Sequence, residues 1–104
     1  MFARQVSVRL KSNMVSDYTN TFETEILPLL RKQKGFKDEI SLSNPGSPDA
    51  IAISLWENKA DAEAYNTTTY PTVLKIAEPM IEARPKVQTF ELVTSTLQTA
   101  PVAA

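Results

Sequence analysis

The 104-residue sequence contains no cysteine and no histidine, and only two of its residues are glycine. Without cysteine it cannot form a disulfide, a thiolate nucleophile or a thiolate metal site, and a reducing compartment is permitted. Without histidine it lacks the commonest metal ligand and the side chain that most often serves as a general base near neutral pH. Gly35 and Gly46 are too few to build the usual glycine-rich loop that holds phosphates. Thiol, metal and nucleotide chemistry are therefore not expected, and any catalysis must use other groups.

The charges and apolar runs point to a globular domain with no preference for nucleic acid or membrane. The formal net charge is -1 and the 11 basic residues are scattered, so no basic stripe follows a phosphate backbone. No apolar run is long enough for a signal peptide or a membrane span, and we expect a cytoplasmic protein. With 42% hydrophobic residues, the chain should bury one core. We expect one domain over residues 1–97 and a flexible C-terminal tail over residues 98–104.

Alternating hydrophobicity predicts four β-strands, which span residues 2–10, 36–43, 50–57 and 86–97. In the second of these strands Phe36, Asp38, Ile40 and Leu42 fall on one face. Residues 44–48 form a dense cluster of turn-forming residues and predict a hairpin loop between the second and third strands.

Apolar residues at three- and four-residue steps predict a long helix over residues 14–34, ended by Gly35. Ser12 or Asn13 can accept a hydrogen bond from its first free amides. Pro28 lies inside this helix, where it removes a backbone donor and crowds the preceding turn. We therefore expect a kink or a break near Pro28.

The second crossover is also predicted to be helical. Asn58 can cap its first part, and the threonine run 67–69 favours a break. Pro71 suits the first turn of a further short helix, which ends before Pro85. The resulting order β-α-β-β-α-β predicts an α+β, ferredoxin-like antiparallel sheet with its helices on one face.

The third strand has no polar face, which predicts cover on both sides. Its two faces carry Ile51, Ile53 and Leu55 on one side and Ala52, Ser54 and Trp56 on the other. We expect Trp56 to face the helices and the isoleucine face to pack against the sheet of a second copy, as a homodimer. In the alternative arrangement the helices cover the isoleucine face and Trp56 points to solvent.

Residues 54–65 (SLWENKADAEAY) end the third strand and open the second crossover. This segment resembles the W-E-S-x-E-A turn of the antibiotic biosynthesis monooxygenase superfamily, and the order of elements agrees over residues 2–97. The resemblance implies a dimeric α+β barrel with a pocket between the helices and the sheet of each subunit. Members of the superfamily include cofactor-independent oxygenases that convert anthrone-like phenols into quinones, quinol oxygenases and haem-degrading enzymes.

The haem-degrading members place an asparagine, a tryptophan and an iron-binding histidine around the haem. By position these fall near Val6, Tyr65 and Lys75 in this sequence. Valine cannot hydrogen-bond an iron-bound oxygen, and a protonated lysine cannot ligate iron. We therefore expect no haem and no other cofactor.

The resemblance also suggests a set of site residues. Trp56 could stack on an aromatic ligand and donate to its oxygen, or it could fill the core. Cations at the pocket mouth could stabilise a phenolate as it forms. The candidate catalytic residues are Trp56, Tyr65 and Lys75, and the candidate substrate-binding residues are Tyr18, Phe22, Ser54, Tyr70 and Arg84.

Two functions remain open from the sequence. The first is a cofactor-independent monooxygenase that acts on a small aromatic phenol or quinol. The second is a non-catalytic dimer that binds a small apolar ligand or has an accessory role. The second draws support from Ala52 and Ala62, which stand where the anthrone oxygenases carry an asparagine and a tyrosine.

Overall fold

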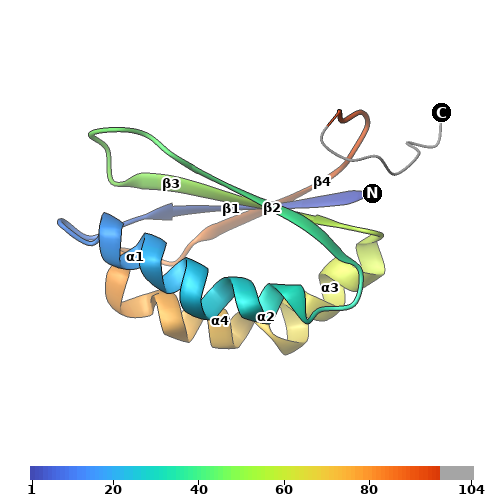
Figure 1. The fold of residues 1–104 in the computed structure, drawn as a ribbon, viewed down its shortest axis with the longest axis horizontal. Helices are drawn as coiled ribbons and strands as arrows, with labels where there is room; N and C mark the ends of the chain where they lie inside the picture. Colours follow the sequence, from blue (N-terminus) through green and yellow to red (C-terminus); the bar gives the residue numbers. More distant parts are fainter. Residues whose placement is uncertain (97–104) are drawn as a thin grey trace.

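The computed structural model describes residues 1–96 and shows one antiparallel sheet with helices on one face (Figure 1). The strands are β1 (Phe2–Arg9), β2 (Phe36–Ser43), β3 (Asp49–Trp56) and β4 (Lys86–Glu91), in the spatial order β2-β3-β1-β4. The helical segments are α1 (Val15–Thr21), η1 (Phe22–Ile26), α2 (Leu27–Arg31), α3 (Lys59–Thr68), α4 (Tyr70–Ala77) and η2 (Glu78–Met80). The predicted ferredoxin-like α+β fold is confirmed. No helix among the described residues is long and apolar enough to cross a membrane.

The fourth strand is shorter than its sequence predicts. It ends at Glu91, which pairs with Phe2 at the very start of β1. Beyond this point β1 has no residues left to pair with, and only the amide of Leu92 still bonds to the carbonyl of Met1. Residues 92–96 therefore leave the sheet despite their β-branched composition, because a strand needs a partner. The expected domain end at residue 97 and the expected flexible tail over residues 98–104 lie outside the described residues.

The first crossover stays helical through Pro28 but changes its helical form just before it, near the point where the sequence predicts a kink or a break. Residues Phe22–Ile26 form a π-helical turn, in which the amide of Leu27 bonds to the carbonyl of Phe22. Pro28 has no amide hydrogen. It lies in the first turn of α2, where the backbone position does not require a hydrogen-bond donor. The predicted cap is wrong, because α1 begins after Met14 without any side-chain bond and Asn13 adopts a positive φ of 63°. Such π-helical turns often occur at functional sites.

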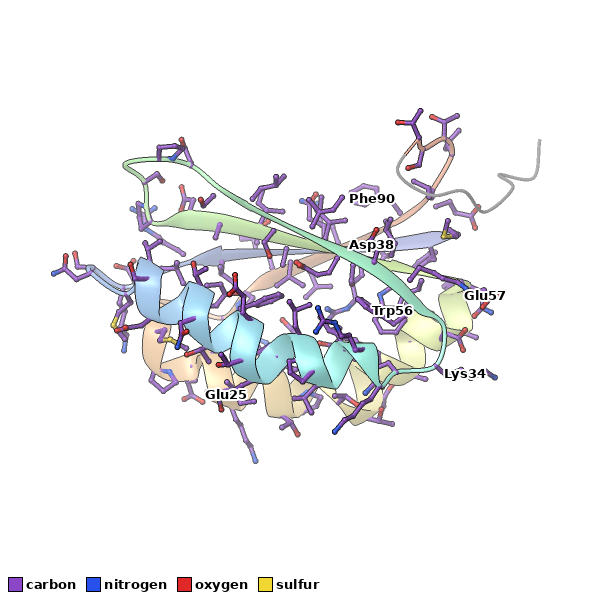
Figure 2. All side chains as sticks on the ribbon, viewed as in Figure 1. Glu25, Lys34, Asp38, Trp56, Glu57 and Phe90 are labelled. Atoms are coloured by element: carbon purple, nitrogen blue, oxygen red, sulfur yellow. The ribbon has the colours of Figure 1, made fainter. Side chains whose placement is uncertain are left out.

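The core lies between the sheet and the helices. Trp56 is 0% exposed and packs there against Phe36 and Tyr65, with ring centroids 5.6 and 5.0 Å away. Figure 2 shows Trp56 on the helix side of the sheet and Phe90 on the opposite side. The expected orientation of the third strand is therefore confirmed.

The outer face of the sheet carries apolar side chains that no described helix covers (Figure 1). By strand register this face holds Ile40, Leu42, Ile51, Ile53, Leu55 and Phe90. Leu42 and Phe90 are 51% and 50% exposed, Ile40, Ile51 and Ile53 are half-buried, and Leu55 is buried at 4%. We call these six residues the outer apolar face.

Gly35 is required for two reasons, and its replacement is expected to destabilise the fold. Its φ of 79° is one that residues with a Cβ rarely adopt, and a Cβ would collide with the Asp61 carboxylate of α3. Gly46 has nearly the same φ of 78° but open space around it. Gly35→Ala should therefore lower the free energy of unfolding by about 1–3 kcal/mol more than Gly46→Ala. Equal losses in urea titrations of the two variants would show that the contact with Asp61 does not matter.

Candidate functional site

A small chamber and a wider groove lie between the helices and the sheet. The chamber has a volume of about 40 Å³. The adjoining groove measures about 330 Å³ and runs between α1 with η1 and the strands β2 and β3. The two share Tyr18, Phe22, Glu39 and Ala52 as common walls. The chamber has room for only a few atoms, so a ligand as large as an aromatic ring would fit only in the groove, with one edge toward the chamber.

A buried cation, Arg4, forms part of the chamber wall. Its side chain is on the helix side of β1, and the residue is only 3% exposed. Its guanidinium carbon lies 4.0 Å from the centre of the Tyr70 ring and 5.2 Å from that of Tyr65. Its Nη2 donates a hydrogen bond of 2.9 Å to Oδ1 of Asn66. No described carboxylate forms an ion pair with it.

An arginine buried without an acidic partner is costly, because the charge loses its hydration. The two tyrosine rings and the Asn66 amide offset part of this cost through cation–π contact and one hydrogen bond. The remaining donors of the guanidinium are available to an anionic ligand. The part of the chamber wall beside Arg4 is therefore positively charged.

Tyr70 adds a second unsatisfied group beside Arg4. The residue is 8% exposed, and its hydroxyl has no hydrogen-bond partner among the described residues. The guanidinium of Arg4 lies over the ring of Tyr70. Burial raises the pKa of Tyr70, and the nearby charge of Arg4 opposes that rise. The hydroxyl thus stays protonated near neutral pH and can donate to a ligand oxygen.

Glu39 is the only carboxylate that lines the chamber among the described residues. It is half-buried, and its Oε2 accepts a hydrogen bond of 2.7 Å from Oγ of Ser41. Burial raises the pKa of Glu39, the bond from Ser41 opposes the rise, and the charge of Asp38 adds to it.

The strand register places Arg4, Ser54 and Glu39 side by side in one row across three neighbouring strands. Arg4 pairs with Ser54, and Ser54 pairs with Glu39, so the three residues cross β1, β3 and β2 on the helix side. In the middle of the row the Ser54 hydroxyl accepts a 2.9 Å hydrogen bond from Nε1 of Trp56. The row places a cation and an anion at opposite ends of the chamber floor.

Five of the candidate residues predicted from sequence line the chamber, namely Tyr18, Phe22, Ser54, Tyr65 and Tyr70. Trp56 is not a lining residue, because it is buried behind Tyr65 with its indole nitrogen engaged by Ser54. Lys75 is exposed on α4 and lines neither the chamber nor the groove. Arg84 lines a different surface pocket beside η2. Of these three cations, Arg4 alone lines the chamber in the part of the chain that the structure describes.

Sequence reasoning missed both charged residues of the chamber. Arg4 stands in phase with Val6 and Val8, and a charge on the apolar face of a strand was the available signal. The sequence did not indicate that Glu39 faces the core. Strict alternation puts Phe36 and Ile40 on the core face and Glu39 on the other face of the strand. A register shift between Phe36 and Asp38 makes Phe36 face the core while Ile40 faces outward, so that Glu39 turns to the helices.

No protein-family model matches the sequence, and no curated protein matches it. Solved structures do match. SnoaB, a cofactor-independent oxygenase from Streptomyces nogalater, is 8% identical with a TM-score of 0.76, over 93% of this chain and 97% of that one. A protein of unknown function from Nitrosomonas europaea is 18% identical with a TM-score of 0.75, over 93% of each chain. An antibiotic biosynthesis monooxygenase is 12% identical with a TM-score of 0.72, over 90% of this chain and all of that one. The chain therefore has the fold of the antibiotic biosynthesis monooxygenases.

Proposed function

We propose that this protein is a cofactor-independent monooxygenase that acts on a small phenol or quinol. The observation that carries the proposal is Arg4, a cation buried without a carboxylate at the wall of a chamber between helices and sheet. In this arrangement the aromatic ring lies in the groove and its oxygen reaches Arg4 and Tyr70. The fold shared with SnoaB, a cofactor-independent oxygenase, supports the same assignment.

The chemistry requires an electron-rich substrate and a group that stabilises its anion. Ionisation of the hydroxyl makes the ring electron-rich enough to reduce dioxygen directly. An unsubstituted ring carbon conjugated with this oxygen can then become a carbonyl. Its hydrogen and the hydroxyl proton leave with one oxygen atom as water, and the other oxygen atom stays on the carbon. The substrate supplies all four electrons, so the balance needs no further reductant. Arg4 would stabilise the negative oxygen in a site that excludes water.

Oxygen uptake by the purified protein tests this function. The panel contains anthrones, dihydroxynaphthalenes and quinols, each compared with a blank that lacks protein. We expect uptake above the blank together with a quinone-type product. No uptake across the panel would contradict the proposal. If ligands of the panel still raised the melting temperature, the protein would be a binding module for small aromatic molecules.

We further propose that the outer apolar face pairs with the same face of a second copy, as the sequence predicts. Two sheets of this kind pack face to face, and an identical surface is self-complementary about a two-fold axis.

Ile53 lies near the middle of this face, on β3, which runs between β1 and β2. Ile53→Lys should give a monomer in sedimentation velocity, because the lysine charge would be buried. Ala60→Lys on the exposed surface of α3 is the control and should remain dimeric. A monomeric parent protein would refute the pairing. A cytoplasmic location of the protein stays a prediction from the sequence.

A further inference from the structure

Two opposite charges face the same chamber without pairing. Arg4 and Glu39 are separated by one strand, which puts their Cα atoms about 10 Å apart. Neither has an ion-pair partner among the described residues, and the gap between them is the chamber with its adjoining groove. A cation and a carboxylate at this spacing fit a ligand oxygen between them.

We infer that Glu39 is the general base that takes the proton from the substrate hydroxyl whose oxygen Arg4 holds. This inference rests on the proposed function. In the step, the O–H bond breaks, its electron pair stays on the oxygen beside Arg4, and the proton moves to the Glu39 carboxylate. Nothing is oxidised or reduced until dioxygen reacts with the anion.

The other titratable groups around Glu39 do not serve as a base near neutral pH. Burial and the charge of Glu39 raise the pKa of Tyr18 to about 12, and burial raises that of Tyr65 to about 12. Burial also raises the pKa of Tyr70. The remaining charged groups near this region are Arg4 from β1, Glu23 from η1 and Asp49 from β3, while Asp38 neighbours Glu39 from the outer face of β2 and Arg84 lies near Tyr70. Glu23 and Asp49 line only the outer groove.

The hydrogen bond from Ser41 orients the carboxylate. It occupies Oε2 of Glu39, and the described residues give Oε1 no partner. Oε1 is therefore the oxygen available to a ligand proton. A raised pKa also makes Glu39 a better proton acceptor than an ordinary surface carboxylate, because it narrows the gap to the pKa of a phenol.

The test uses 4-nitrophenol as a probe, because its absorption band separates the ionised form from the neutral one. Titrations are made below the solution pKa of the probe, and calorimetry in two buffers gives the protons exchanged. The parent protein should bind the probe as the phenolate without net proton release, because Glu39 keeps the proton. Glu39→Gln should either bind neutral probe or release about one proton per phenolate bound. Glu25→Gln, at an exposed residue of η1, should behave as the parent (Figure 2).

Identical spectra and proton counts in the parent and Glu39→Gln would overturn the role of Glu39. A parent that binds only the neutral probe would overturn it as well. Oxygen uptake separates the failure of the Glu39 base assignment from the failure of the proposed monooxygenase activity. If the parent consumes oxygen and Glu39→Gln does so equally fast at every pH, only the base assignment fails. If Glu39 is the base, Glu39→Gln should be about 10²–10⁴-fold slower near neutral pH and should recover as the pH approaches the pKa of the substrate. If the parent neither binds the probe nor consumes oxygen, both proposals fail.

Discussion

Replacing Arg4 by methionine is expected to lower oxygen uptake by about 10²–10³-fold, the usual effect of removing one group that stabilises an oxyanion. The same variant should keep or raise the melting temperature of the protein. Methionine is flexible and apolar, although shorter than arginine, and it removes the charge of a residue that is 3% exposed and has no carboxylate partner among the described residues. Asn66 loses one hydrogen bond but is exposed, so water replaces the guanidinium.

Two variants make this result specific. Arg4→Lys keeps the charge but loses the planar group that stacks on Tyr70, so it should retain part of the activity. Arg31→Met removes an exposed cation at the end of α2 and should leave both activity and stability unchanged. If Arg4→Met unfolded the protein or consumed oxygen at the parental rate, Arg4 would be a structural residue and the proposed site would be wrong.

Trp56→Ala is expected to lower the free energy of unfolding by about 3–5 kcal/mol, as large aromatic truncations in a core do. For a domain of this size the melting temperature should fall by roughly 15–30 °C. Trp56 is the largest fully buried side chain, and it joins β3 to Phe36 of β2 and Tyr65 of α3. Its loss also leaves the Ser54 hydroxyl without its donor.

Trp56→Phe separates packing from chemistry, because it keeps an aromatic ring and removes the indole nitrogen. We expect a smaller loss of stability and an uptake rate per folded molecule within a few-fold of the parent. The reason is that Trp56 does not line the chamber, although the sequence motif suggested a catalytic role. A stable Trp56→Phe protein with little activity would instead support that catalytic role.

Patterns of hydrophobicity predict the frame of this protein well. The order of elements and the hairpin over residues 44–48 follow from alternation and turn chemistry, whereas alternation left two orientations of Trp56 open, of which the expected one is confirmed. The end of β4 does not, because it depends on where β1 begins and not on the residues after Glu91. A strand's length is set by its partner as well as by its own composition.

The candidate site is less predictable than the frame. Its aromatic walls were accessible from sequence, because Tyr18, Phe22, Tyr65 and Tyr70 follow the helical periodicity toward the core. Its charges were not. The irregular register after Phe36 turns Glu39 inward, and such a shift leaves no mark on hydrophobic alternation.

Arg4 illustrates how function departs from the rules of folding. An apolar residue on this face of β1 would be simpler to bury, since the chain gives the guanidinium no acidic partner. The arginine is explained if a ligand supplies the missing negative charge. Local conflicts between burial and charge are expected at functional sites, where stability is lost in exchange for binding.

A crystal structure of the parent protein with a bound hydroxynaphthalene tests the central claim most directly. The account predicts the ring in the groove beside Tyr18 and Phe22, with its oxygen about 2.7–2.9 Å from a guanidinium nitrogen of Arg4. Glu39 should face the same oxygen from the opposite side. A ligand bound on the outer apolar face, or in the groove with its oxygen turned away from Arg4, would contradict the account.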